Sequence, residues 1–180
     1  MGNRLTKIYT RTGDKGDTVL GDGSRTGKSS VRVKAMGDVD ELNSMLGLLR
    51  AQTIPDGVGR SLQAIQHTLF DLGGELSIPG ARMITAQAVL QLEQEIDAFN
   101  ADLPPLKEFI LPAGNQAVAI CHLARAICRR AERSIVELTL TDEINSNSVS
   151  YLNRLSDLLF VSARVLARHD KCEEIYWKDR

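Results

Sequence analysis

Four arginines crowd a short stretch in the second half of the chain, within an otherwise apolar sequence. Residues 121–133 read C-H-L-A-R-A-I-C-R-R-A-E-R. On a helix, Arg125, Arg129 and Arg133 fall at i, i+4 and i+8, so they form one basic stripe. Guanidinium groups beside a packed surface are costly to desolvate unless they meet carboxylates or phosphates. The spacing therefore predicts that this helix is one wall of an anion site.

A second cationic segment lies near the start of the chain. Residues 10–18 read T-R-T-G-D-K-G-D-T. The glycines allow close backbone approach, while hydroxyls, backbone N–H groups and a lysine supply donors to an anion. Asp14 and Asp17 could hold a divalent cation or orient the loop. The same composition also suits a solvated turn, so the residues alone leave both interpretations open.

The next glycine-rich segment is similar to a P-loop but lacks two of its requirements. Residues 21–29 read G-D-G-S-R-T-G-K-S, and Asp22 stands where a P-loop needs the glycine five residues before its G-K-S glycine. The long buried strand that leads into a P-loop is missing as well. Lys28 can still reach a phosphate, but through a different fold.

Other polar residues could either belong to this anion site or only neutralise the charge of its arginines. One short segment contains three acidic residues, Asp38, Asp40 and Glu41, which could simply be exposed charges. Alternatively, Asp40 could pair with an arginine of the basic stripe, within one chain or across a subunit boundary. Asn153 and Asp157, at i and i+4, either line the same cavity or satisfy nearby arginines. The three histidines lack metal-binding spacing, and no Ser-His-Asp or Cys-His arrangement stands out. Chemistry carried by a bound cofactor or substrate is therefore favoured.

Composition sets the class of protein. The 180 residues suit one domain, and a net charge of −1 argues against a global basic field for nucleic acid or membranes. No run approaches the ~18 apolar residues of a membrane span, and the first residues lack an apolar targeting region. Cys121 and Cys128, seven residues apart, have the spacing of core residues rather than of a metal or redox site, and a cytoplasmic location is expected from this cysteine usage.

Apolar residues at alternating three- and four-residue spacing predict five amphipathic helices. In the arginine helix this seam comprises Ala117, Cys121, Ala124, Cys128, Ala131, Ile135 and Leu138. The first helix is predicted to start near Val31. The second follows a break at Pro55–Gly59 and ends at Pro79–Gly80. Thr85 caps the third helix, the fourth spans about Gln116–Leu140, and the fifth reaches about Arg168. Short connections indicate an all-α, up-and-down five-helix bundle of ferritin-like type.

The predicted organisation is a single domain over residues 1–180. An irregular N-terminal loop occupies residues 1–30, with β-prone pieces at Lys7–Thr10 and Thr18–Leu20. The bundle covers residues 31–170, and residues 171–180 form a tail. A glycine-rich loop of this length inside a compact domain is more often functional than idle.

Five segments in collinear order resemble the PduO-type ATP:cob(I)alamin adenosyltransferases. They are I-Y-T-R-T-G-D-K-G-D-T, G-D-V-D-E-L-N-S, F-I-L-P-A-G, A-R-A-I-C-R-R-A-E-R and Y-L-N-R-L-S-D. The resemblance covers nearly the whole chain. It implies a homotrimer of five-helix bundles that binds ATP and a corrinoid where two subunits meet.

The resemblance also implies the roles of individual residues. The ATP-binding loop would contain Thr10, Arg11, Thr12, Gly13, Asp14, Lys15, Gly16, Thr18, Val19 and Lys28, and the bundle would add Arg129, Arg130, Glu132, Arg133 and Asn153. Arg125 would pair with Asp40 of the next subunit, and Phe109 would close against the lower corrin face. Two departures are visible, Ala113 where the family has glycine, and Val19-Leu20 where a glycine is common.

The implied reaction transfers the 5′-deoxyadenosyl group of ATP to cob(I)alamin, giving adenosylcobalamin and triphosphate. Arginines, Lys28 and Mg²⁺ bound mainly through ATP would stabilise the leaving group. Removal of the lower axial ligand would give a four-coordinate cob(II)alamin that a separate reductase can reduce, and an adenosylcobalamin-dependent enzyme would receive the product. A non-catalytic adenosylcobalamin carrier and a helical scaffold with an arginine ion-pair network are the alternatives.

Overall fold

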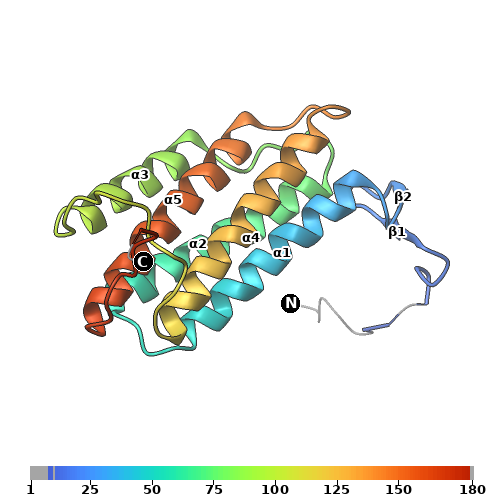
Figure 1. Cartoon of the computed structure of the whole chain (residues 1–180). Coiled ribbons are helices and arrows are strands. Elements are labelled where there is room, and N and C mark those ends of the chain that lie inside the picture. The colour runs from blue at the N-terminus through green and yellow to red at the C-terminus, as the bar shows by residue number, and fades with distance from the viewer. Residues whose placement is uncertain (1–7, 10, 179–180) are drawn as a thin grey trace, which may run out of the picture.

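The computed structural model describes residues 8–9 and 11–178 and contains the five expected helices (Figure 1). A two-stranded hairpin precedes them. The elements are β1 (Asp17–Val19), β2 (Arg25–Gly27), α1 (Val31–Arg50), α2 (Asp56–Ser77), α3 (Ala86–Asn100), α4 (Gln116–Leu138) and α5 (Ser146–His169). The all-α bundle predicted from helical periodicity is confirmed.

Consecutive helices run in opposite directions, as an up-and-down bundle requires (Figure 1). Helix α1 contacts α2 on one side and α4 on another, and α4 also packs against α5. Helix α3 packs along α5 and contributes one fully buried residue, Leu92, to the core. The arginine-bearing α4 is therefore held between α1 and α5, and only its remaining face is free for ligands or partners.

The apolar seam of α4 is buried along its whole length. All seven of its predicted members are at most 5 % exposed, including both cysteines. Each thiol donates to a backbone carbonyl of α5, Cys121 to Leu159 and Cys128 to Leu152, at 3.2 Å. Burial raises the pKa of Cys121 to about 12 and raises that of Cys128 further, so both thiols are structural.

Helix boundaries follow capping groups more closely than apolar spacing. Thr85 caps α3 as predicted, because its side chain accepts a hydrogen bond from the Ala88 backbone N–H at 3.2 Å. The predicted break at Pro55–Gly59 is too long, since α2 already begins at Asp56 and includes Gly57 and Gly59 of that break. Pro55 precedes the first helical residue, where its missing N–H costs nothing.

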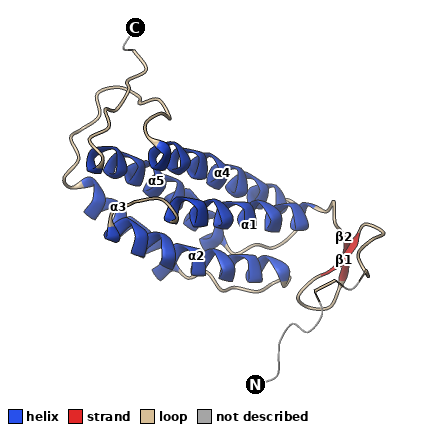
Figure 2. Cartoon of the chain, turned by 90° about the horizontal axis from the view of Figure 1, so that it is seen from below, coloured by secondary structure: helices blue, strands red, loops and turns tan. Residues whose placement is uncertain are grey.

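The N-terminal hairpin stands at the end of the bundle, beyond the start of α1 (Figure 2). Strands β1 and β2 pair antiparallel, with Thr18 opposite Thr26 and Val19 opposite Arg25. The β-prone piece predicted at Thr18–Leu20 is thus close to β1. Of the piece predicted at Lys7–Thr10, only residues 8–9 are described, and they lie outside any strand. Among the described helices, none is long and apolar enough to cross a membrane.

Candidate active site

The N-terminal loop folds around a cavity of about 420 Å³. Seven of the predicted loop residues line this cavity, namely Arg11, Thr12, Gly13, Asp14, Thr18, Val19 and Lys28. Tyr9, Asp17 and Arg25 complete its lining. Lys15 and Gly16 lie on the adjoining turn and do not line it, and Thr10 falls outside the described residues. The cavity is lined by three cationic side chains and two carboxylates, so its charge is suited to an anion that binds together with a metal cation.

Close packing around Gly13 explains why the loop needs glycine there. A Cβ at this position would lie 3.0 Å from both Lys28 Nζ and the Asp17 carbonyl oxygen. The Lys28 backbone N–H donates to the Gly16 carbonyl at 2.7 Å, which ties the turn to the start of the bundle. Lys28 is therefore held beside the glycine loop although it follows it by more than ten residues.

Arg25 is a cavity residue that the sequence analysis did not identify. The antiparallel register places it opposite Val19, and its guanidinium lies 3.9 Å from the Asp17 carboxylate. Arg11, at φ 62°, stacks over the Tyr9 ring at 5.6 Å. Neither predicted β-prone piece contains Arg25, and β2, which carries it, was not predicted, so the sequence analysis had no signal for this residue.

The hairpin is attached to the bundle through Gly21. Its backbone N–H donates to the Ser77 carbonyl at the end of α2 over 2.7 Å. A Cβ on Gly21 would lie 2.7 Å from Ile78 Cγ1 and 2.8 Å from Ser77 Oγ, closer than real Cβ atoms approach. This glycine therefore fixes where the loop cavity stands relative to the helices.

The consecutive arginines of α4 face different neighbours. Arg130 turns to α1, where its Nε donates to Asp38 at 3.1 Å and its Nη2 donates to Glu41. The hydrogen bond that Arg130 donates to Glu41 is the main reason that the pKa of Arg130 is raised. Asp38 also accepts from Ser134 Oγ at 2.5 Å. Arg130, expected at the nucleotide, is already engaged with two carboxylates of its own chain.

A polar chain joins the other flank of α4 to α5 and α3. Asn153 donates to Glu132 at 3.0 Å and accepts from Arg154 Nη1 at 2.6 Å, and Arg154 pairs with Glu93 at 2.8 Å. Of the two interpretations for Asn153, the structure shows contacts with charged neighbours. Glu132 and Asn153 are thereby held in fixed positions at the α4–α5 boundary.

Arg129 and Arg133 occupy the outer face between these two flanks. Both are exposed, one turn apart, and neither takes part in an ion pair within the described residues. The loop cavity is lined by residues 9–28 alone, so it includes no residue of α4. The two cationic features therefore do not form one site within the described part of a single chain.

Arg125 and Asp40 lie on different sides of the bundle. Arg125 is half-buried on the face of α4 that also carries Glu132, next to α5, and its Nε is buried without a hydrogen-bond partner in the described chain. Asp40 is exposed and lines a groove of about 480 Å³ between α1 and α2. No ion pair joins the two among the residues described.

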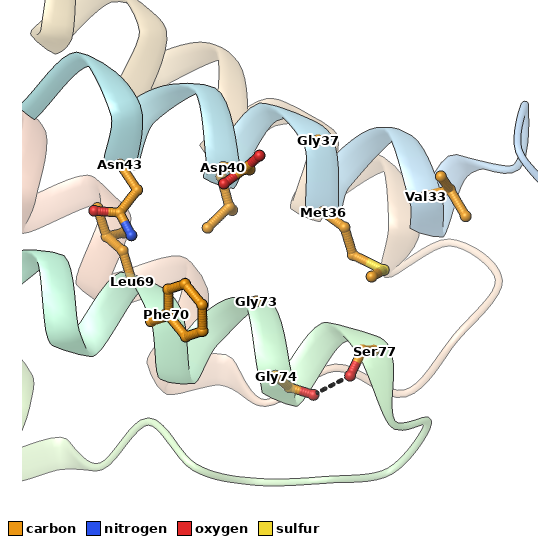
Figure 3. Close-up of a pocket in the computed structure, with 11 residues that line it drawn as sticks. Val33, Met36, Gly37, Asp40, Asn43, Leu69, Phe70, Gly73, Gly74 and Ser77 are labelled. Atoms are coloured by element: carbon orange, nitrogen blue, oxygen red, sulfur yellow. Dashed lines mark hydrogen bonds between the residues drawn. The ribbon is translucent and has the colours of Figure 1, made fainter. Parts of the chain in front are cut away.

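The groove beside Asp40 is mostly apolar. Met36 and Asn43 extend from α1 toward α2, and Phe70 extends from α2 into the same space (Figure 3). Phe70 is 77 % exposed, a large value for an aromatic ring on a helix of the bundle. An apolar groove with one carboxylate at its edge has the character of a surface that another molecule covers.

Phe109 lies on the irregular segment before α4 and is 80 % exposed. Ala113, which stands where the family has glycine, leaves the backbone of this segment unstrained. The position that needs glycine is Gly114, because it has a positive φ of 143° and a Cβ there would lie 2.8 Å from Val118 Cγ1. The departure at Val19 is equally compatible, since this β-branched residue lies in β1.

Metal-binding groups are sparse. No group of three or more His, Cys, Asp or Glu side chains gathers to hold an ion within residues 8–9 and 11–178. His122 is buried with its ring 6.4 Å from that of Phe160, and burial lowers its pKa, while His67 and His169 are exposed. The two loop carboxylates, Asp14 and Asp17, are the acidic groups in the loop cavity.

Comparisons with known proteins agree on one family. The sequence model of cobalamin adenosyltransferases matches residues 8–166. A cobalamin adenosyltransferase of Cupriavidus metallidurans is 55 % identical over 99 % of this chain and 97 % of its own length. A corrinoid adenosyltransferase of Bacillus subtilis is 47 % identical over 89 % of this chain and 86 % of its own.

Solved structures give the same result. A Phe-to-His variant of a PduO-type ATP:corrinoid adenosyltransferase from Lactobacillus reuteri, complexed with cobalamin and ATP, superimposes with a TM-score of 0.90 at 36 % identity. The match covers 96 % of this chain and 97 % of that one. An Arg-to-Lys variant of the same enzyme, complexed with ATP, gives a TM-score of 0.88 over 95 % of this chain and all of that one.

Proposed function

Because the chain belongs to the cobalamin adenosyltransferase family, we propose that it transfers the 5′-deoxyadenosyl group of ATP to cob(I)alamin. The products are adenosylcobalamin and triphosphate. The observation that carries this proposal is the division of cationic groups between two surfaces, the loop cavity with Arg11 and Lys28 and the outer face of α4 with Arg129 and Arg133. Together these surfaces have the charge to hold a triphosphate from both sides.

The reaction needs no nucleophilic side chain. The lone pair of cobalt(I) attacks the 5′ carbon of ATP, a cobalt–carbon bond forms, and the C5′–O bond breaks with its electron pair going to triphosphate. The protein has to align the two substrates and to stabilise the charge on the leaving oxygens. Exposed guanidinium groups without carboxylate partners suit this task, which favours Arg129 and Arg133.

Arg130 has a different part in this proposal. Its guanidinium already donates to Asp38 and Glu41, so turning it to a phosphate would leave both carboxylates without their charged partner. We assign to Arg130 the fastening of α4 to α1, which keeps the neighbouring Arg129 pointing outward. Glu132 and Asn153 fix the opposite flank of α4 and border the nucleotide site.

The complete site is formed between subunits of a homotrimer. Within one chain the loop cavity and the α4 arginines do not meet, and Asp40 and Arg125 lie beside different helices. The buried Arg125 Nε without an acceptor fits a carboxylate supplied by another copy, and Asp40 is exposed at the edge of an apolar groove. Two different faces that recognise each other produce a closed ring when the rotation closes, here with three members.

Phe109 serves the reduction that must precede transfer. Cob(II)alamin accepts an electron more easily when its lower axial ligand is removed and cobalt is four-coordinate, and an exposed aromatic ring can exclude base and water from that face. The electron comes from a separate reductase, and the product passes to an adenosylcobalamin-dependent enzyme. Mg²⁺ enters bound mainly through ATP.

The test supplies ATP and chemically reduced cob(I)alamin to the protein under anaerobic conditions and follows the absorption spectrum. We expect conversion to the spectrum of adenosylcobalamin with one triphosphate released per turnover. Absence of product from an intact trimer would refute the proposal. Calorimetry with ATP separates the alternatives, because an adenosylcobalamin carrier has no need of a triphosphate site and a scaffold binds neither ligand.

A further inference from the structure

The C-terminal tail pairs with the segment that carries Phe109. Ile110 and Tyr176 form an antiparallel β-bridge, the Trp177 backbone N–H donates to the Phe109 carbonyl at 2.9 Å, and that of Leu111 donates to Ile175 at 2.8 Å. These two backbone hydrogen bonds flank Ile110, and one of them is made by the carbonyl of Phe109, the residue whose ring is exposed. The family match ends at residue 166, so this pairing strand lies beyond the matched part of the chain.

A buried ion pair fastens both partners of this pairing to the bundle. Arg164 of α5 is 3 % exposed, its Nε donates to Glu174 at 2.7 Å, and its Nη2 donates to the Pro104 carbonyl at 2.8 Å. Glu174 begins the pairing strand of the tail, and Pro104 begins the irregular segment that contains Phe109. One guanidinium thus holds the start of both segments.

We propose that Arg164 and Glu174 are positioning residues that latch the C-terminal tail behind Phe109 and so hold its ring in place. This inference rests on the proposed role of Phe109 in cob(II)alamin reduction. Neither latch residue touches a substrate. A buried charge-assisted pair with good geometry keeps segments in register, whereas the exposed Lys178–Glu108 pair at 2.9 Å contributes little. When the latch opens, the hydrogen bond to the Phe109 carbonyl is lost and the ring no longer stays against its target.

Trp177 reports the state of the latch directly, because it is the one tryptophan of the chain and it belongs to the pairing strand. Glu174→Gln keeps the shape of the side chain but removes its charge, and Glu173→Gln is the matched control at the exposed neighbouring position. We expect acrylamide to quench Trp177 fluorescence about twofold more strongly in Glu174→Gln, as a released tail exposes the ring fully. Equal quenching constants in the two variants would overturn the proposal.

Activity then separates positioning from general structural damage. With cob(II)alamin and a reductant, Glu174→Gln should lose turnover on the order of tenfold, since small displacements at a reacting centre have large effects. With pre-reduced cob(I)alamin it should stay within about twofold of the Glu173→Gln control. Equal losses from both substrates contradict the proposal. Trp177→Pro, which removes the N–H that binds the Phe109 carbonyl without touching the buried pair, should reproduce the selective loss.

A double-variant cycle identifies the residue through which the latch acts. If Glu174 works through Phe109, the variant Phe109→Ala/Glu174→Gln is no slower from cob(II)alamin than Phe109→Ala alone. Additive losses mean that the latch acts elsewhere, and they overturn the inference. A wild-type chain that forms no adenosylcobalamin from cob(I)alamin refutes the proposed function instead, and the quenching comparison still decides whether Glu174 holds the tail.

Discussion

Arg130 donates from Nε to the Asp38 carboxylate over 3.1 Å and joins α4 to α1. Asp38 is largely buried and receives a second hydrogen bond from Ser134. The adjacent Arg129 is exposed and has no such partner among the described residues. Two neighbouring arginines of one helix thus differ in their surroundings: Arg130 holds two helices together, and Arg129 stays exposed on the surface that we propose faces the ligand.

Alanine substitutions should separate these tasks. Arg129→Ala is expected to lower turnover about 100-fold or more while changing the free energy of unfolding by less than about 0.5 kcal/mol. Arg130→Ala leaves Asp38 without its charged partner and should lower the free energy of unfolding by about 1–3 kcal/mol. Urea unfolding and anaerobic turnover assays measure both quantities. The assignment is wrong if Arg130→Ala unfolds like wild type.

Gly21 sets the position of the hairpin against α2. Because a Cβ there would lie 2.7 Å from Ile78 Cγ1, Gly21→Ala has to displace the hairpin or accept about 1–3 kcal/mol of overpacking strain. We expect the KM for ATP to rise about tenfold, with the melting temperature of the bundle nearly unchanged. Gly57→Ala is the matched control, since it has open space around its Cβ within α2. An unchanged KM in Gly21→Ala would show that the loop works independently of this contact.

Apolar spacing was sufficient for the helices because burial of one face determines them. The seam of α4 was predicted residue by residue, and Thr85 was recognised by its side-chain chemistry. Spacing could not tell which neighbouring helix each arginine would meet, so the contact between Arg130 and α1 was missed. Arg25 reaches the cavity through strand register, and the tail reaches Phe109 through pairing distant in sequence. Such long-range contacts leave no local periodic signal.

Asp142 gives the stability of the protein a defined dependence on pH. Its carboxylate accepts from the buried Arg32 at 2.5 Å, and this hydrogen bond, with a second from Thr141, lowers the pKa of Asp142 below 3.8. The depressed pKa means that its stabilisation is fully present above about pH 4 and is lost as the pH falls through the folded-state value. Asp142→Asn should therefore cost about 1–3 kcal/mol at pH 7 and progressively less below pH 4.

Thermal unfolding of wild type and Asp142→Asn between pH 7 and pH 2.5 measures this difference. Glu143→Gln is the adjacent control, because its pair with Arg82 is exposed on both sides and contributes little. A difference between wild type and Asp142→Asn that stays constant down to pH 2.5 would exclude the ion pair with Arg32 as its origin.

Asp40 and Arg125 provide a test of the intersubunit site by charge reversal. In one chain they lie beside different helices, so the proposed pair would join Asp40 of one copy to Arg125 of another. Asp40→Arg places two cations opposite each other in the assembly, and Arg125→Glu places two carboxylates there. We expect each single variant to shift the protein from trimer toward monomer in sedimentation or light scattering, because like charges at an interface cost several kcal/mol.

The double variant Asp40→Arg/Arg125→Glu restores opposite charges at every interface of a ring and should recover the trimer. Asp71→Arg is the control, since Asp71 is exposed on α2 and does not line the groove. Each of the two faces also carries an exposed apolar side chain, Phe70 on α2 and Val136 on α4. These side chains supply apolar contact area between subunits, and the charged pair fixes how the two faces are aligned. Recovery in the double variant requires that the two residues meet across the interface. A double variant more dissociated than either single one would show that they meet different partners.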